Sequence, residues 1–142
     1  MLANFQRDAL VNAIAGKDNV NGAIPSQYYI GLLKEIPVAD QSTPPAEVST
    51  VNTNYSRMVV GNNKTVFSPA VNGVVSTVSE LSWLPVGEAG YGNVVAVAMF
   101  ATQTGGLPMY VSVLATPKTY DKDDIPFFLP GGIRFTVQDA VD

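Results

Sequence analysis

Two apolar runs separated by a pair of glycines dominate the pattern of hydrophobic and polar positions in this chain. The first run, Val94–Phe100, is apolar at every position, and the second, Met109–Leu114, alternates between two sets of side chains. Between them lies Gly105-Gly106, and glycine supplies the positive φ angles of a tight hairpin turn without steric strain. We therefore predict a β-hairpin at the centre of the fold, with both faces of its first arm covered.

Shorter runs of β-branched and aromatic residues on either side of this hairpin predict further strands, because such residues suit a pleated, half-buried surface. The predicted strands are Gln27–Lys34, Tyr55–Val60, Thr65–Phe67, Val74–Val78, Ile125–Leu129 and Ile133–Val137. Pro126 marks Ile125–Leu129 as an edge strand, since proline cannot donate to a ladder. Together the pattern predicts an all-β fold, a β-sandwich or flattened barrel of about seven to eight mostly antiparallel strands.

The first residues have a helical pattern instead. Apolar side chains recur at spacings that place them on one face of a helix. They are Leu2, Phe5, Leu10 and Ile14. Gly16 stands where a helix commonly ends. We predict a short amphipathic helix over residues 1–16 in front of a β-sandwich over residues 17–142, the two forming a single domain. This helix either lies across an open end of the sandwich or docks into a neighbouring subunit.

A long polar stretch, Pro37–Thr53, is predicted to be a loop. Pro44 and Pro45 cannot donate to a ladder and favour polyproline geometry. Connections of about 15 residues are long for a compact domain, and such loops are often functional or interfacial. We therefore expect either a subunit contact through Pro44, Pro45 and the apolar Val48, or plain disorder.

Cysteine and histidine are both absent from the 142 residues. Their absence excludes disulfides, thiolate and imidazole metal sites, and nucleophilic systems that depend on histidine. The net charge of −4 removes the attraction on which nucleic-acid binding usually relies. No run approaches the roughly 18 apolar residues of a membrane span. We predict a chain that is not an enzyme, uses no cofactor, and binds neither nucleic acid nor membrane.

The remaining candidates for chemistry are carboxylates and aromatic rings. Asp121, Asp123 and Asp124 could offer oxygen ligands to calcium, but the glycine and distal glutamate of a calcium loop are missing. A solvated turn is therefore the preferred interpretation. Trp83 and the tyrosines could stack on sugar rings, although packing in the core is the default for aromatic residues in strands.

Several of these segments together resemble a family of small bacteriophage virion proteins described as tail-fibre-like. The segments are YYIGLLKEIP, Tyr55-Ser56-Arg57, the central hairpin followed by Leu114–Thr119, the acidic turn, and the glycines before the last strand. Family members often carry Trp-Gly just before the first arm, where this chain has Tyr91-Gly92. The resemblance implies a structural virion component, made in the host cytoplasm and assembled in many copies, with no catalytic residues.

Composition agrees with an assembled state. Only 14% of the residues are charged, against about 25% in a typical soluble domain. Either the surface is polar but uncharged, rich in Ser, Thr, Asn and Gln, or other subunits cover part of it, and we favour the second interpretation because the long loops also carry apolar residues. We predict a tail, collar, fibre or capsid-surface protein whose partners are copies of itself and other virion proteins. Two alternatives stay open. One is a receptor- or carbohydrate-binding module for a host-surface glycan, and the other is a head decoration or cement protein.

Overall fold

The computed structural model describes residues 15, 25–37 and 43–136. Within this part of the chain there are eight strands, every pair of which runs antiparallel, and no helix. The strands are β1 Gln27–Leu33, β2 Met58–Gly61, β3 Val74–Ser76, β4 Leu81–Ser82, β5 Gly92–Phe100, β6 Tyr110–Tyr120, β7 Phe127–Phe128 and β8 Arg134–Thr136. The predicted all-β, antiparallel fold is confirmed. The predicted helix, with Leu2, Phe5, Leu10 and Ile14, lies outside the described residues.

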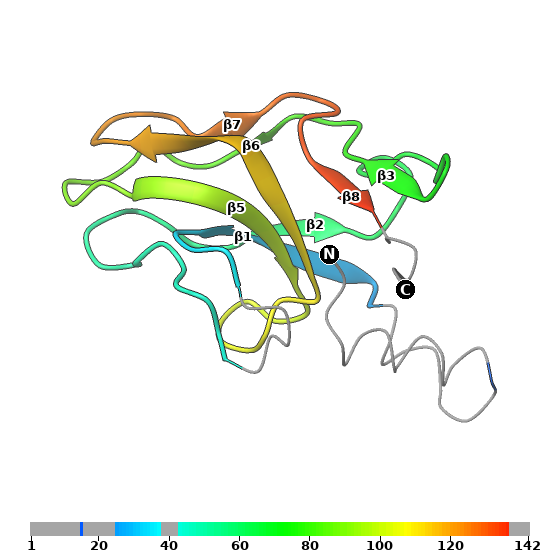
Figure 1. Ribbon diagram of the computed structural model, residues 1–142. Coiled ribbons are helices and arrows are strands. Elements are labelled where there is room, and N and C mark those ends of the chain that lie inside the picture. Colours follow the sequence, from blue (N-terminus) through cyan, green and yellow to red (C-terminus); the bar gives the residue numbers. More distant parts are fainter. Residues whose placement is uncertain (1–14, 16–24, 38–42, 137–142) are drawn as a thin grey trace.

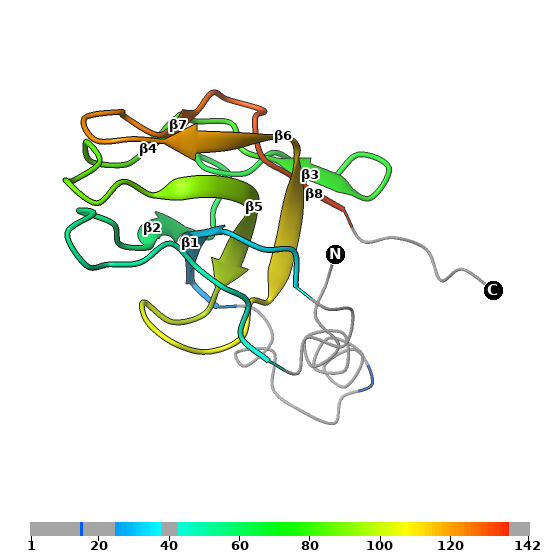
Figure 2. The same ribbon diagram turned by 60° about the vertical axis from the view of Figure 1, so that its left-hand side comes forward.

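The strands form one four-stranded sheet and two small ladders. The sheet has the order β2-β1-β5-β6, and the ladders pair β3 with β8 and β4 with β7 (Figure 1). Figure 2 shows β1, β5 and β6 side by side, with β4 and β7 next to the upper part of β6. The described strand pairs do not close into a ring, so the predicted alternative of a flattened barrel is wrong.

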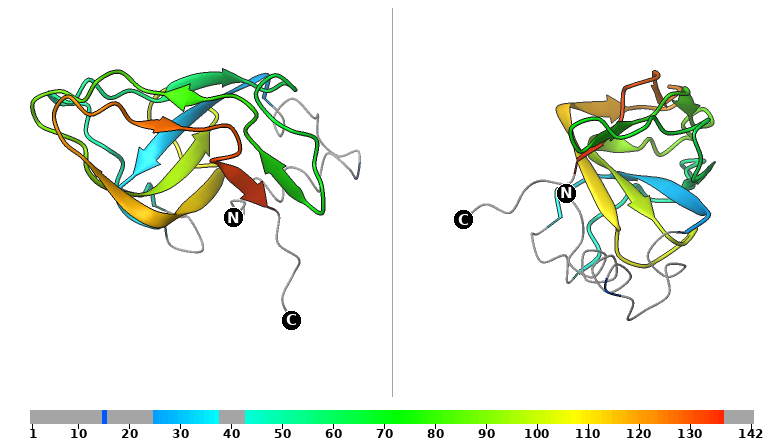
Figure 3. Two further views of the ribbon diagram at one scale, coloured as in Figure 1. Left: turned by 90° about the horizontal axis from the view of Figure 1, so that it is seen from above. Right: turned by 90° about the vertical axis from the view of Figure 1, so that its right-hand side faces the viewer.

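The main core lies between the sheet and the ladders. Side chains of the sheet, such as Ile30, Leu32 and Val97, share one buried cluster with Phe128 of β7 and Phe135 of β8. The two views in Figure 3 show the ladders lying over one side of the sheet. Since burying apolar surface is the main favourable term in folding, this cluster is what holds the layers together.

Strand β5 is buried on both faces, as its unbroken apolar run predicts. Val94 and Val97 belong to the main core. Ala96, Ala98 and Phe100 belong to a second buried cluster, which also contains residues of β1 and β6. Both clusters are therefore built around this strand.

A bulge divides the β5–β6 ladder into two parts. Val94 pairs with Lys118, but Ala96 pairs with Val113, so the four residues Leu114–Pro117 of β6 lie opposite Val95 alone. Bulges bend the strand that carries the extra residues, and β6 is sharply bent in Figure 1. Pro117 falls within the bulge, where its missing N–H interrupts no ladder hydrogen bond.

The connection between β5 and β6 differs from the predicted tight turn. Gly105 and Gly106 do have positive φ angles, 66° and 74°. The connection nevertheless runs through residues 101–109, because the ladder ends with the hydrogen bond from Met109 N–H to Met99 O. The glycine pair therefore lies within a wider loop, called the tip loop below.

The shorter predicted strands are only partly present. Thr65–Phe67 forms no strand and contributes a single bridge between Phe67 and Thr77. Ile125–Leu129 contracts to β7, and Ile133–Val137 contracts to β8, with Val137 outside the described residues. In the last segment Ile133 and Phe135 are buried and Arg134 is exposed, an alternation typical of a strand with one buried face.

Tyr91→Phe is expected to stabilise the protein. The Tyr91 side chain is 2% exposed and packs edge-to-face on Tyr55 and Tyr120, but its hydroxyl has no hydrogen-bond partner in the described structure. Removing a buried, unsatisfied hydroxyl should raise the free energy of unfolding by about 1 kcal/mol. Urea denaturation measures the change. Tyr55→Phe is the control of opposite sign, because the Tyr55 hydroxyl makes two hydrogen bonds. A loss of stability in Tyr91→Phe would contradict this account.

Candidate functional site

A largely buried ion pair connects the region before β2 with the tip loop. Glu47 forms a bridge with Leu33 at the end of β1, and Arg57 immediately precedes β2. Arg57 Nη2 lies 2.8 Å from Glu47 Oε2, and Arg57 Nε lies 3.0 Å from Glu47 Oε1. Their side chains are 5% and 23% exposed, so the two parallel contacts form a largely desolvated fork.

The Nη1 edge of the same guanidinium binds the tip loop. Arg57 Nη1 donates to the carbonyl oxygens of Thr102 and Gly105, at 2.9 and 2.8 Å. The guanidinium carbon lies 3.4 Å from the centroid of the Phe100 ring, a close cation–π contact. One side chain thus satisfies two loop carbonyls and fixes the path of the loop, which explains why the connection is wide.

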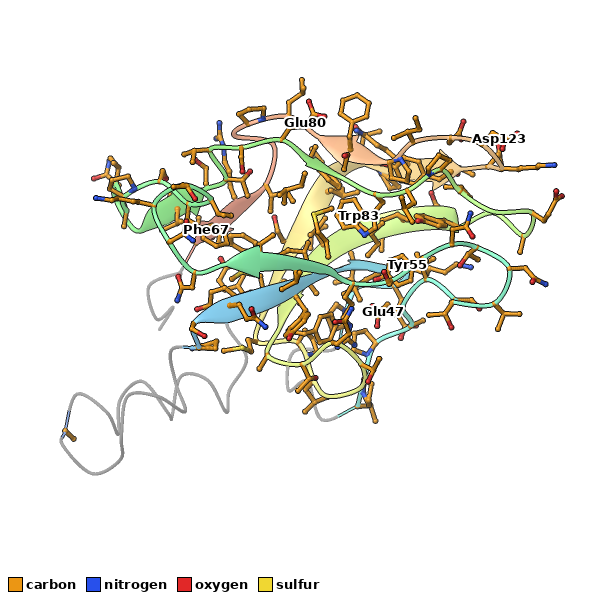
Figure 4. All side chains as sticks on the ribbon, turned by 180° about the vertical axis from the view of Figure 1, so that it is seen from behind. Glu47, Tyr55, Phe67, Glu80, Trp83 and Asp123 are labelled. Atoms are coloured by element: carbon orange, nitrogen blue, oxygen red, sulfur yellow. The ribbon has the colours of Figure 1, made fainter. Side chains whose placement is uncertain are left out.

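Tyr55 completes the network, as Figure 4 shows from behind, with Glu47 and Tyr55 next to each other. Its hydroxyl donates to Glu47 Oε1 at 2.5 Å and accepts from the N–H of Leu32 at 2.9 Å. Burial, and then the Glu47 carboxylate, raise the pKa of Tyr55 far above its usual value. The hydroxyl therefore stays protonated and keeps donating to the carboxylate.

The network leaves no room for a side chain on β1 at Gly31. A Cβ added there would lie 2.8 Å from Phe100 Cε2 and 2.9 Å from Glu47 Oε1. The sequence did not reveal this cluster, because Glu47 stands in a polar stretch and was one of several scattered carboxylates. The available signal was Arg57, a single charge next to the apolar Met58–Val60. Since its polar groups already bind one another, the cluster is suited to holding loops and not to proton transfer.

A row of exposed apolar side chains covers the outer face of the β4–β7 ladder. Ile125, Phe127 and Leu129 are 55%, 47% and 59% exposed, while Pro126 and Phe128 between them are buried. Leu84 is 68% exposed and follows β4, whose Ser82 pairs with Phe127. We call Leu84, Ile125, Phe127 and Leu129 the apolar strip. Contiguous exposed apolar groups of this kind commonly mark contact surfaces.

The sequence matches the family model described as Podophage GP4 fiber I protein gp80 over residues 1–136. The chain belongs to this family. No curated protein sequence matches the chain. The predicted resemblance to tail-fibre-like virion proteins is confirmed, and membership of the fibre I family makes the chain a virion component. Among the described residues no helix is long and apolar enough to cross a membrane.

The contact residues predicted for this fibre I family member fall into three groups. Leu2, Phe5, Leu10 and Ile14 lie outside the described residues. Pro44 is exposed and Pro45 half-buried, so both stay predictions. The prediction of Val48 as a contact residue is wrong. Val48 is 3% exposed, belongs to the core and donates its N–H to Leu32 O.

The predicted sugar-stacking residues are mostly internal. Trp83 is 7% exposed, packs edge-to-face on Phe128 and donates Nε1–H to Ser56 O at 3.1 Å, so its assignment to the core is confirmed and its use as a stacking surface is wrong. The same holds for four buried tyrosines, which are Tyr55, Tyr91, Tyr110 and Tyr120. Tyr28 and Tyr29 are half-buried.

The acidic turn Asp121–Asp124 is held by the Asp124 carboxylate and by backbone hydrogen bonds. Asp124 Oδ2 accepts from Asp121 N–H at 2.7 Å, and Asp123, with φ 71°, donates its N–H to Val86 O. Nowhere in residues 25–37 and 43–136 do three acidic side chains come together as a metal site requires. The hydrogen bonds of Asp124 and Asp123 therefore serve to stabilise the turn itself.

Proposed function

We propose that this chain is a structural component of the phage fibre, which acts through protein–protein contacts and catalyses no reaction. The observation that carries the proposal is the apolar strip on the β4–β7 ladder, in a member of a fibre protein family. Four large apolar side chains in water are unfavourable by roughly 25 cal/mol for each Å² that a partner would cover. A protein that works in an assembly recovers this free energy at its interface.

The partner at the apolar strip is another copy of the same chain. The strip contains no charged side chain, so two identical strips meet without like-charge repulsion. The rest of the chain carries a net charge of −4, which opposes close approach of copies through charged surface. Closed homo-oligomers are the commonest form of protein assembly, and identical surfaces that meet across a two-fold axis must be complementary to themselves.

Sedimentation velocity on the full chain over a range of concentrations tests this interface. Phe127→Thr combined with Leu84→Thr places β-branched residues, which suit strands, at both positions and removes the large apolar groups. We expect the dissociation constant of the oligomer to rise at least about 30-fold, as the loss of one hot-spot side chain of about 2 kcal/mol implies. The thermal midpoint should stay within a few degrees of the wild type.

Val59→Thr is the matched control. Val59 is 54% exposed but lies on β2, away from the strip, so the oligomer should be unchanged. A wild-type chain that stays monomeric at every concentration, or a strip variant that assembles like the wild type, would refute the proposed interface.

A further inference from the structure

A cavity of about 630 Å³ opens between β1, β3, β8 and the loop after β2. Its volume lies within the range of about 300–1,000 Å³ that is usual for ligand sites. Six apolar or aromatic side chains form its walls, namely Tyr28, Phe67, Val75, Met99, Tyr110 and Phe135. Phe67 is labelled in Figure 4, beside β3 and on the far side of Trp83 from the tip of the acidic turn at Asp123.

The aromatic walls are fixed by one another. Phe67 meets Tyr28 edge-to-face with centroids 6.1 Å apart, and Phe135 meets Phe67 at 6.2 Å and Tyr110 at 4.8 Å. The Tyr110 hydroxyl is already engaged, since it donates to Thr136 O and accepts from Thr136 N–H. These walls therefore offer a preformed surface for an apolar group and few free polar atoms.

The polar side of the cavity lining has acceptors that are already used and donors that remain. Among the acceptors, Asn63 Oδ1 already accepts from the N–H and the hydroxyl of Thr65, and Ser68 Oγ already accepts from Ser76 N–H. Lys64 is exposed and lines the cavity, and its ammonium forms no ion pair within the described residues. The Tyr28 hydroxyl accepts from Asn62 Nδ2 at 3.4 Å, and among the described residues its own hydrogen has no acceptor. A group that satisfies these donors must be an acceptor, and an anion is preferred beside an ammonium.

We propose that this cavity binds an apolar side chain that is adjacent to an acidic residue on an extended segment of a neighbouring virion protein. The aliphatic or aromatic group enters the ring-lined wall, and the carboxylate lies against Lys64 and the Tyr28 hydroxyl. This inference rests on the proposed structural role in the fibre. Pro69, Ala70 and Gly73 are exposed at the cavity lining, so a peptide segment can reach the opening. The cavity uses none of the residues of the apolar strip, so the two surfaces can be tested separately.

Two fluorescent probes of similar shape test the chemistry of the cavity on the purified full chain. 8-Anilinonaphthalene-1-sulfonate is apolar with one negative charge, and N-phenyl-1-naphthylamine is its neutral counterpart. We expect both to bind with increased fluorescence, the sulfonate more tightly. Lys64→Gln should weaken binding of the sulfonate about fivefold, leave the neutral probe unchanged, and make the sulfonate less sensitive to salt. Equal effects of Lys64→Gln on both probes would overturn the anion preference.

A pair of neighbouring substitutions tests the location. Ala70 lines the cavity and is exposed, whereas Val71 is 67% exposed and is not among the cavity-lining residues. Ala70→Phe should fill the opening and abolish binding of both probes, while Val71→Phe adds a ring of the same size outside and should bind like the wild type. Unchanged probe binding in Ala70→Phe, with an unchanged thermal midpoint, would overturn the site.

Incorporation into phage particles identifies the occupant. Particles assembled with Ala70→Phe should carry fewer copies of the chain, and those with Val71→Phe a normal number, by quantitative mass spectrometry. If Ala70→Phe abolishes probe binding but is incorporated normally, the virion-protein occupant is overturned. The proposed interface between copies is tested separately, by sedimentation of the Phe127→Thr, Leu84→Thr double variant without either probe. A negative result there therefore does not bear on the cavity.

Discussion

Val97→Asp is expected to prevent the chain from folding. Val97 is completely buried in the main core, and its strand neighbours are Leu32 on β1 and Ser112 on β6. A carboxylate there would have no cationic partner, because the buried cluster that contains Val97 is made of aliphatic and aromatic side chains. Burying such a group costs several kcal/mol even when it is protonated, against a total stability of about 5–15 kcal/mol for a domain.

Circular dichroism and the soluble yield after expression measure this effect. We expect Val97→Asp to be insoluble or to lack a cooperative thermal transition. Val113→Asp is the control, since Val113 lies in the neighbouring strand β6 but is 51% exposed. That variant should fold with a midpoint close to the wild type. A soluble Val97→Asp protein with cooperative unfolding would show that β5 is not the centre of the core.

The second large effect is expected for Arg57→Met. The substitution replaces a buried cation with an unbranched apolar side chain. The Glu47 carboxylate and the carbonyl oxygens of Thr102 and Gly105 in the tip loop then lose their hydrogen-bond donor. Breaking one side of a buried ion pair typically costs 3–5 kcal/mol, and since Glu47 is partly exposed we expect about 3 kcal/mol. Urea denaturation measures the loss, and limited proteolysis should show new cleavage within residues 101–109.

A double-mutant cycle with Glu47→Gln separates the pair from its surroundings. If the two side chains act together, the double variant should be more stable than the sum of the single effects predicts, by at least about 1 kcal/mol. Additive losses would mean that Arg57 stabilises the protein through the tip loop and Phe100 alone. An Arg57→Met protein as stable as the wild type would contradict the role given to the whole network.

The elements predicted best from the sequence are those whose signal is local. The unbroken apolar run of β5 requires cover on both faces, and the structure provides it. The tip loop was predicted wrongly because a glycine pair is a local signal for a tight turn. What shapes the loop is Arg57, which lies 45 residues before Thr102 and meets it only in the folded chain. Residue spacing in the sequence does not predict such a long-range contact.

The apolar strip could not be predicted from the sequence for a different reason. Alternation in Ile125–Leu129 separates two faces, but both faces are apolar, so the pattern cannot say which is buried. The structure buries Pro126 and Phe128 and exposes Ile125, Phe127 and Leu129. Val48 shows the reverse error, because an apolar residue in a polar stretch was predicted to be a contact residue, yet it adds to β1 and joins the core.

The four residues of β6 opposite Val95 have a consequence for how this chain can vary between relatives. Pairing is already interrupted there, so gaining or losing one residue between Val113 and Lys118 shifts neither flanking ladder. Anywhere else along β5 or β6, the same change would turn every following side chain to the opposite face. Differences in length among fibre I proteins should therefore collect at this bend.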